Sequence, residues 1–223
     1  MEKTILCYGD SNTWGFVPQN LESQTYALAR YSREERWTGL LQKKLGNKYY
    51  VVEEGLNGRT TNIDYQYPPD RNGKTYLLPC LYSHAPINLV IFLLGGNDCK
   101  SYFNRSANEI RQGMEELIDV VQTTNYGSGF MEAPKVLILT QPIPFNICEK
   151  FQDENRVYVF EGSIRKAKDL VGLYMDLAKR KNCYLIDISE KVKPSDVDGM
   201  HFNLEGHKII ANLLYTKILE VDL

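Results

Sequence analysis

The sequence predicts an α/β fold in which a central parallel sheet of about five strands is covered by helices on both faces. Two patterns point to this fold. Short runs that are apolar throughout, as strands buried on both faces require, recur along the chain. Amphipathic helical segments separate these runs, and such alternation is typical of right-handed β-α-β crossovers in a doubly wound sheet.

The predicted elements follow one another in this alternating order. The strands are short, are bounded by Gly, Pro, Asn or Asp, and cover 4–8, 49–53, 89–94, 136–140 and 184–188. The helices cover 34–45, 106–121, 164–181 and 205–219, and Gly46 is the stop signal of the first. The connections 62–86 and 141–162 are too long for plain turns. We expect both to rise over the carboxyl edge of the sheet, where long loops tend to be functional.

Composition limits the class of protein. The chain has 223 residues, of which 43% are hydrophobic and 24% charged, so we expect one domain, 1–223, with a sizeable core. The formal net charge is −2, and no dense cluster of Lys and Arg suggests nucleic-acid binding. No apolar run is long enough to cross a membrane, and the first strand begins too close to Met1 for a signal peptide.

The number and spacing of the cysteines indicate the redox state of the compartment and whether a metal site is expected. The five cysteines are scattered and form no Cys-x-x-Cys pair, which argues against a disulfide framework or a zinc knuckle. This usage fits a reducing cytoplasm. Since the His and Cys residues lack the spacing of metal ligands along the chain, we expect neither a metal nor another cofactor.

A serine follows the first predicted strand, in the segment Gly9-Asp10-Ser11. Its hydroxyl is expected at the carboxyl edge of the sheet, where open α/β folds bind ligands. A serine hydroxyl is a weak nucleophile until a base removes its proton, so this interpretation requires a histidine and an orienting acid elsewhere in the chain. Taken alone, Ser11 is also explained as a turn residue or a helix N-cap.

Two further strand ends carry polar segments. In 55–60, after the second strand, Gly58 lets the backbone approach a ligand closely, and its N–H can point at an anionic oxygen. In 95–98, after the third strand, the Asn97 side-chain amide can donate to the same oxygen, while Asp98 can hold local backbone N–H groups. Taken singly, each segment is also an ordinary turn.

The three histidines of the chain differ in their surroundings. His84 has no neighbouring acid in the sequence and lies in a predicted loop, so we interpret it as a surface residue. His207 lies in the last predicted helix, at a solvated or capping position. His201 follows Asp198 by three residues. A short turn there lets the carboxylate accept from one ring nitrogen and leaves the other free to face Ser11.

These motifs, Gly9-Asp10-Ser11, Gly58, 95–98 and Asp198-x-x-His201, occur in this order over nearly the whole chain. The set resembles the SGNH (GDSL-type) hydrolase superfamily, and most closely its bacterial arylesterases and acyltransferases. The likeness includes 5–18, 36–39, 54–64 and 133–137. It implies a flavodoxin-like three-layer sandwich. It also implies roles for the motif residues: nucleophile Ser11, general base His201, orienting acid Asp198, and an oxyanion hole made by the backbone N–H groups of Ser11 and Gly58 with the Asn97 side chain.

Two positions depart from the superfamily pattern. Asn12 stands where many members carry an apolar residue, so we expect a more polar floor of the acyl pocket. Gly96 replaces a threonine common among the arylesterases, which opens space or flexibility beside Asn97. We expect these residues to support or line the substrate pocket: Asp10, Asn12, Trp14 and Asp98. Several aromatic residues either make the entrance apolar or belong to core or subunit contacts: Trp14, Phe16, Tyr65, Tyr67, Phe145 and Phe151.

The resemblance implies hydrolysis of short-chain, acetyl-like esters through an acyl-serine. Transfer of the acyl group to an alcohol would compete where an apolar entrance disfavours water. A carbohydrate acetylesterase on the same scaffold is the main alternative, because the Tyr-rich loops can stack on a sugar ring. A non-catalytic binding protein is the alternative from another class. The related proteins form homo-oligomers, so we expect a homo-oligomer that acts on a small-molecule ester.

Overall fold

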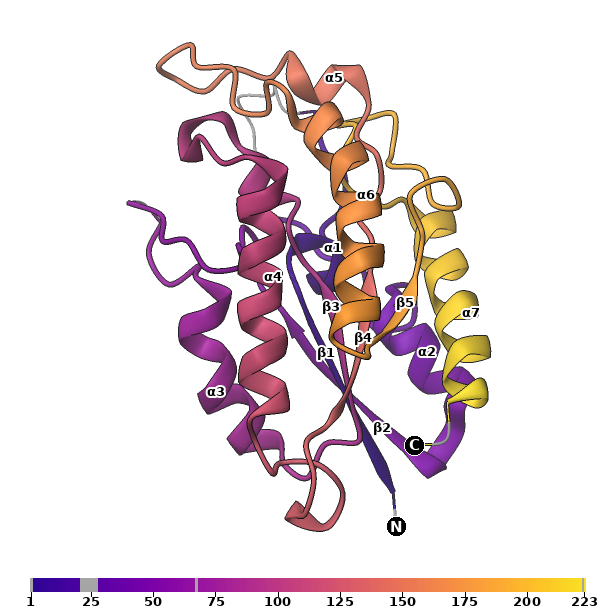
Figure 1. Ribbon diagram of the computed structural model, residues 1–223. Helices are drawn as coiled ribbons and strands as arrows, with labels where there is room; N and C mark the ends of the chain where they lie inside the picture. Colours follow the sequence, from indigo (N-terminus) through magenta and orange to yellow (C-terminus); the bar gives the residue numbers. More distant parts are fainter. Residues whose placement is uncertain (1, 21–27, 67, 222) are drawn as a thin grey trace.

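The computed structural model describes residues 2–20, 28–66, 68–221 and 223, and its strands and helices alternate as predicted (Figure 1). The strands are β1 (Lys3–Gly9), β2 (Tyr49–Gly55), β3 (Leu89–Leu93), β4 (Lys135–Leu139) and β5 (Tyr184–Ile186). The longer helices are α2 (Trp37–Leu45), α3 (Gly73–His84), α4 (Ala107–Gln122), α6 (Ser163–Arg180) and α7 (Leu204–Glu220). The short helical segments are α1 (Ser11–Trp14), α5 (Asn146–Glu149), η1 (Gly46–Lys48), η2 (Asn97–Cys99), η3 (Ser101–Phe103) and η4 (Ser128–Phe130).

The five strands form one parallel sheet in the order β2-β1-β3-β4-β5. The register pairs Gly9 of β1 with Gly55 of β2 and with Leu93 of β3, so these three strands end at the same level. From β1 the chain moves outward to β2 and then crosses back to β3. The strand order therefore reverses between β1 and β3, and ligands of open α/β sheets bind at such a reversal. Ser11 follows β1 at this point.

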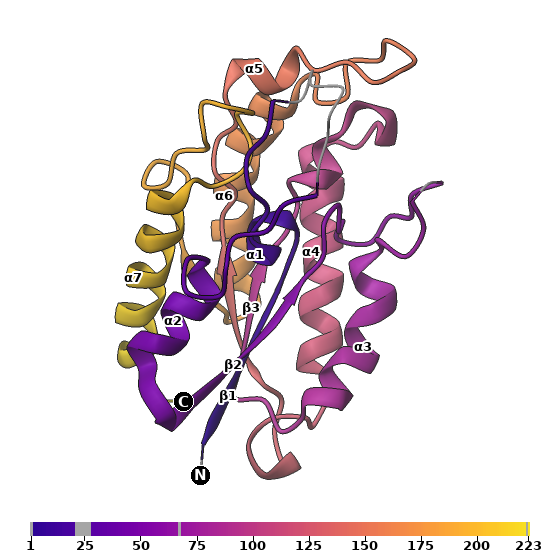
Figure 2. The same ribbon diagram turned by 180° about the vertical axis from the view of Figure 1, so that it is seen from behind.

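Helices cover both faces of the sheet (Figures 1 and 2). On one face, α3, α4 and α6 pack against alternate strand residues such as Tyr8 and Phe92. On the other face, α2 and α7 pack against the intervening strand residues, such as Cys7 and Ile91. The central strands β1, β3 and β4 are therefore buried from both sides, which confirms the three-layer sandwich and explains their apolar sequences. Within the described residues, no helix is long and apolar enough to cross a membrane.

The predicted boundaries agree closely for three helices and are wrong for one segment. Helices α4, α6 and α7 match their predicted ranges to within one residue at each end. Helix α2 begins three residues later than predicted, at Trp37. The segment 62–86, expected as a loop, contains the twelve-residue helix α3, which begins after an Asn72 N-cap and includes Pro79. A proline inside a helical pattern is normally a stop signal, so the sequence pattern missed this helix.

Candidate active site

The turn after β1 holds Ser11 at the carboxyl edge of the sheet. Ser11 is the first residue of α1, and the side chain of the preceding Asp10 caps this helix by accepting a hydrogen bond from the Asn12 backbone N–H at 2.9 Å. Gly15 ends α1 in the left-handed conformation, with a φ of 89° that glycine adopts without strain. A cap at one end and a glycine at the other therefore place the serine.

Three side chains from opposite ends of the sequence form a continuous chain of hydrogen bonds. His201 Nε2 lies 2.9 Å from Ser11 Oγ, and His201 Nδ1 lies 2.8 Å from Asp198 Oδ2. Asp198 Oδ1 also accepts the backbone N–H groups of Met200 and His201, at 2.9 and 3.0 Å. The structure thus brings Ser11, His201 and Asp198 together in the arrangement that activation of a serine requires.

The electrostatics of Asp198 suit this arrangement. The side chain is fully buried, and burial alone would raise its pKa. Hydrogen bonds and charge from the His201 ring, with the backbone N–H groups of His201 and Met200, outweigh burial and hold the pKa of Asp198 below its ordinary value. The carboxylate is therefore ionised at neutral pH. It favours the tautomer in which His201 Nδ1–H donates to Asp198, which leaves Nε2 to accept from Ser11.

Asn12, expected in the pocket, also holds the histidine loop. Its Oδ1 accepts the Phe202 backbone N–H at 2.9 Å, and its Nδ2 donates to the Met200 carbonyl at 3.4 Å. Its own carbonyl accepts from the Trp37 indole at 3.1 Å. The side chain of Asn12 therefore binds the residues on both sides of His201. No pattern in the sequence reveals this contact, because its partners are 188 and 190 residues away.

A pocket of about 290 Å³ has both Ser11 and His201 in its wall. Most of the residues predicted for the site line it: Asp10, Ser11, Asn12, Gly58, Asn97 and His201. Four polar residues that the sequence pattern did not single out also line it: Asn57, Lys100, Gln141 and Ser163. Among the aromatic residues, Phe16 and Phe151 contribute to the wall as expected, together with Phe160. The wall therefore combines a polar part near Ser11 with apolar rings.

The groups expected to hold an oxyanion share this pocket. Gly58 has a φ of 80°, which a residue with a side chain rarely adopts. Asn97 donates through Nδ2 to the carbonyl of Arg59 at 3.2 Å, so its amide is tied to the turn that contains Gly58. Ser11, Gly58 and Asn97 all belong to the pocket wall. Their role as oxyanion donors remains a prediction.

Two residues expected around the substrate lie outside the pocket wall. Asp98 is fully buried, and burial raises its pKa. Its carboxylate accepts from Thr61 Oγ1 and the Thr61 backbone N–H and forms an ion pair with Arg105 at 2.6 Å. Asp98 therefore anchors the 55–62 segment from behind. Trp14 packs its ring under the Arg30 guanidinium, 4.8 Å from the ring centroid, and does not line the pocket.

The remaining aromatic residues expected at the entrance either do not line the pocket or lie outside the described residues. Tyr65 and Phe145 are not part of the pocket wall. Tyr65 is buried beside the pocket residue Lys100, whose Nζ donates to the Tyr65 hydroxyl at 2.8 Å. Tyr67 lies outside the described residues.

Two ionisable groups of the pocket wall have pKa values near neutrality. Burial raises the pKa of Asp10 to about 6 and lowers that of Lys100 to about 8. The Asp10 carboxylate favours the charged form of Lys100, whereas His201 and Arg59 favour the charged form of Asp10. The charge of this wall therefore changes within about one pH unit on either side of neutrality.

The structure corrects the interpretation of the other two histidines. His84 ends α3, is partly buried and lies 2.9 Å through Nε2 from Glu54 Oε1, so it does have an acidic neighbour. His207 is fully buried, not solvated. Its Nδ1 accepts the Trp37 backbone N–H at 3.2 Å, so His207 of α7 caps the first N–H of α2.

Comparison with known proteins yields one family and several similar structures. The model of the GDSL-like lipase/acylhydrolase family matches residues 7–209. The aryl esterase of M. smegmatis is 36% identical, with a TM-score of 0.87 over 98% of this chain and 99% of that one. Est24, a carbohydrate acetylesterase from Sinorhizobium meliloti, is 35% identical, with a TM-score of 0.88 over the same shares. An acetylxylan esterase of Xylanibacter ruminicola is 26% identical over 96% of this chain, which spans 42% of that protein.

Proposed function

The chain belongs to the GDSL-like lipase/acylhydrolase family and is a carboxylic ester hydrolase, and from this premise we propose that it cleaves short-chain esters through an acyl-enzyme on Ser11. The observation that carries the proposal is the chain of hydrogen bonds from Asp198 through His201 to Ser11. This chain ends in a pocket of about 290 Å³, at the small end of the range for ligand sites. The similarity to Est24, a carbohydrate acetylesterase, and to an acetylxylan esterase supports an acetyl-like acyl group.

The proposed reaction has two halves, the acylation of Ser11 and the hydrolysis of the acyl-serine. The Ser11 hydroxyl attacks the ester carbonyl while His201 Nε2 takes its proton, and Asp198 stabilises the imidazolium. The N–H groups of Ser11 and Gly58 and the Asn97 amide stabilise the oxyanion; loss of one such donor costs on the order of 10²–10³ in turnover. His201 then protonates the leaving alcohol. In the second half His201 activates water, which hydrolyses the acyl-serine.

Hydrolysis of p-nitrophenyl acetate, butyrate and octanoate tests the proposal. We expect the activity of the wild-type protein to fall as the acyl chain lengthens and to vanish in Ser11→Ala. Ser83→Ala is the matched control, because Ser83 is an exposed serine that bonds only to Pro79 of its own helix among the contacts described. Equal activity in wild type and Ser11→Ala, or no labelling of Ser11 by an organophosphonate, contradicts the assignment of the nucleophile.

A carbohydrate acetylesterase is the second candidate, and the polar part of the pocket favours it. Among the described residues, Asn57 Oδ1 is buried without a hydrogen-bond partner, and Asn57 belongs to the pocket wall with Lys100 and Gln141. An oxygen in this state is available to a sugar hydroxyl. The similarity to Est24 and to the acetylxylan esterase supports the same candidate. It predicts a higher kcat/KM on acetylated xylo-oligosaccharides than on p-nitrophenyl acetate; the reverse ratio favours the aryl or alkyl ester.

Acyl transfer to alcohols is a further proposed activity. Its support is the group of rings in the pocket wall, Phe16, Phe151 and Phe160, of which Phe16 lies with its ring centroid 4.4 Å from that of His201. Apolar rings next to the base disfavour water relative to an alcohol at the acyl-enzyme. With an alcohol added in water, we expect new ester to form beside free acid. Free acid alone contradicts acyl transfer.

We also propose that the protein is a homo-oligomer of a reducing cytoplasm. Large apolar side chains are exposed at several places, including Tyr82 and Met131, and all five cysteines are free thiols. Self-association would bury side chains of this kind, and free thiols support a reducing compartment. Light scattering after size exclusion tests the first point, since a monomeric mass contradicts it. Cell fractionation tests the second.

A further inference from the structure

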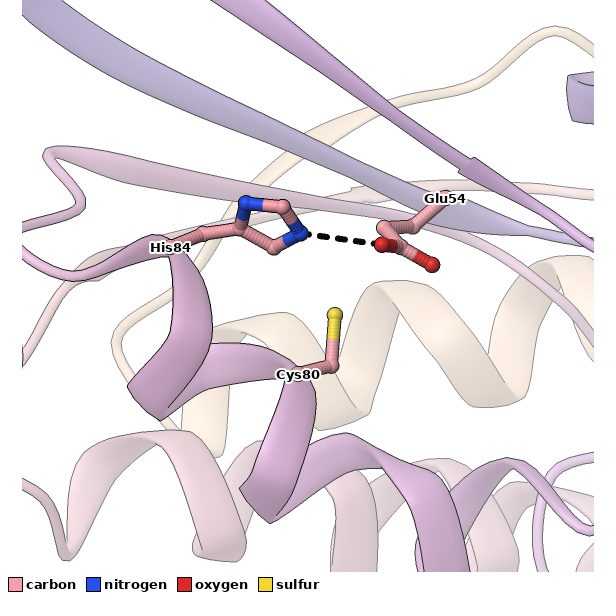
Figure 3. Close-up of side chains that lie close together, drawn as sticks. All are labelled: Glu54, Cys80 and His84. Carbon is pink, nitrogen blue, oxygen red and sulfur yellow. Dashed lines mark hydrogen bonds and ion pairs between the residues drawn. The ribbon is translucent and has the colours of Figure 1, made fainter.

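Glu54, Cys80 and His84 bring three metal-binding side chains together away from the esterase pocket (Figure 3). One ligand atom from each lies within 4.8 Å of the other two, which holds for no other trio of His, Cys, Asp and Glu among the described residues. His84 Nε2 lies 2.9 Å from Glu54 Oε1, and the Cys80 thiol points toward the space between them. None of the three lines the pocket of Ser11, so the proposed hydrolysis does not account for the cluster.

The fold assembles this cluster from a helix and a strand end. Cys80 and His84 lie four residues apart on α3 (Gly73–His84), and side chains at this spacing share one face of a helix. Glu54 comes from β2 (Tyr49–Gly55), next to its carboxyl end. The sequence pattern does not reveal the Cys-x-x-x-His spacing as a metal site, because it predicts a loop in this segment, and in a loop the spacing does not place the two side chains on one face.

We propose that Glu54, Cys80 and His84 bind one Zn²⁺ ion. A thiolate, an imidazole and a carboxylate are the three ligand types that zinc uses in proteins, whereas Mg²⁺ and Ca²⁺ select oxygen ligands. Three protein ligands leave a fourth tetrahedral position for water. Water and the ion can reach the cluster from the side of Glu54 and His84, whose side chains are 20% and 30% exposed, and Cys80 is the fully buried member of the three.

The geometry needs only small adjustments for binding. Zinc lies about 2.0–2.3 Å from its ligands, so tetrahedral ligand atoms are about 3.3–3.8 Å apart. Rotation of the partly exposed Glu54 and His84 side chains covers the remaining difference of about an ångström from the 4.8 Å limit. Binding replaces the thiol proton of Cys80: Cys–SH and Zn²⁺ give Cys–S–Zn⁺ and a proton released to solvent, while His84 binds as neutral imidazole. No oxidant or reductant is involved.

Charged groups in and around the cluster both favour and oppose the binding of a cation. The bound thiolate and the Glu54 carboxylate together neutralise the two charges of the ion. Arg59 lies close enough for its charge to act on Cys80 and opposes a cation there. Its guanidinium is held by the carbonyls of Glu54 and Gly9 and lies over the ring of Tyr8.

Cobalt substitution gives a direct test, because Co²⁺ bound to a thiolate has a charge-transfer absorption band in the near ultraviolet. The full-length wild-type protein, freed of metal by chelation, is titrated with Co²⁺ and then with Zn²⁺. We expect a band that saturates at one Co²⁺ per chain and is abolished by an equimolar amount of Zn²⁺. Zn²⁺ should also raise the thermal midpoint of unfolding, since only the folded chain brings the three ligands together.

Matched variants assign the signal to the cluster. Cys80→Ser should abolish the band, and His84→Gln should weaken Co²⁺ binding by at least about tenfold, the loss that even outer partners of a metal site cause. Cys183→Ser, which removes a thiol elsewhere, should leave the band unchanged. His84→Gln alters a partly exposed helix end and decides the case if Cys80→Ser fails to fold. No band in the wild-type protein, or a band of unchanged affinity in His84→Gln, overturns the proposal. Esterase activity is not part of this readout, so the result is independent of the proposed function.

Discussion

At the scale of single residues, the site depends on one buried carboxylate with several partners. Asp198 accepts two backbone N–H groups through one oxygen and the His201 ring through the other. The backbone bonds fix the carboxylate, and the fixed carboxylate orients the ring. The short Asp-x-x-His spacing is therefore sufficient to orient the His201 ring, because a single turn supplies both the acid and the N–H donors that keep it ionised.

Asp198→Asn tests this orienting role. The amide cannot stabilise an imidazolium and favours the wrong tautomer of His201, so we expect kcat for p-nitrophenyl acetate to fall by on the order of 10⁴-fold with little change in KM. Asp176→Asn, on the exposed face of α6, is the control and should retain wild-type kinetics. A loss of less than tenfold in Asp198→Asn would show that His201 is oriented by other groups.

At the scale of elements, the site depends on close approach between α1 and the strand ends. A Cβ on Gly55, at the end of β2, would lie 2.5 Å from the Trp14 Cα and would collide with its backbone. Gly55 does not have a positive φ, so the glycine is needed for space and not for its conformation. Absence of this one side chain lets the Ser11 turn pack directly against β2.

Gly55→Ala should therefore displace α1. We expect a loss of about 1–3 kcal/mol in the free energy of unfolding, typical of overpacking, and a lower kcat. Gly172→Ala is the matched control, because a Cβ there meets nothing within 4 Å in the interior of α6. It should stabilise the protein by about 0.5–1 kcal/mol. Urea unfolding and ester hydrolysis measure both effects, and a Gly55→Ala variant indistinguishable from wild type refutes the packing argument.

The contact between α7 and α2 depends on pH through His207. Burial, aided by the charge of Arg36, lowers the pKa of His207 to about 4, below its unfolded value of about 6.5. At a pH between these two pKa values, the unfolded state binds more protons than the folded state. The contribution of His207 to stability is therefore complete above about pH 6.5 and is lost as the pH falls to 4, up to about 3 kcal/mol.

His207→Gln should remove this dependence, since glutamine does not titrate. The free energy of unfolding of wild type relative to His207→Gln should fall by about 2 kcal/mol from pH 7 to pH 5. The difference between the two proteins is the correct measure, because Asp10, with its pKa raised to about 6, acts in the opposite direction. Its contribution decreases as the pH rises from about 4 to 6. A difference independent of pH would show that His207 titrates normally.

At the scale of the whole molecule, the site joins the two ends of the chain. Ser11 and His201 are 190 residues apart in the sequence, and the Asn12 side chain spans the same separation to hold Phe202. The sheet sets the distance between β1 and the segment before α7, while Asn12 sets the final position of the histidine. The packing of the sheet and the side-chain hydrogen bonds of Asn12 thus together position His201 beside Ser11.

Asn12→Ala removes these side-chain hydrogen bonds and leaves the buried Phe202 N–H unpaired, at a cost of about 1–3 kcal/mol in stability. We expect kcat to fall by roughly 10²-fold, because a misplacement of about 1 Å in a catalytic group has this effect. Asn212→Ala, on the exposed face of α7, should match wild type. Unchanged kcat in Asn12→Ala would mean that the histidine loop is rigid without it.

Prediction from sequence succeeded where the relevant pattern is local. Apolar runs identified the five strands, and one-sided apolar spacing identified α4, α6 and α7 to within one residue. It failed for α3, where Pro79 interrupts the pattern. It also failed for His84 and His207, whose partners Glu54 and Trp37 lie 30 and 170 residues away.

The sequence by itself determined the α/β class, the strand ends that carry the polar motifs, and the residues Ser11, Asp198 and His201 as candidates for one site. These follow from local patterns and from the rule that parallel strands end at a common edge. Only the tertiary structure decided that Asn12 holds the histidine loop, that Asp98 supports the site from behind, and that Glu54 meets Cys80 and His84. The physical reason is that a side chain acts on whatever packing places beside it, and for these residues the partners are distant in the chain.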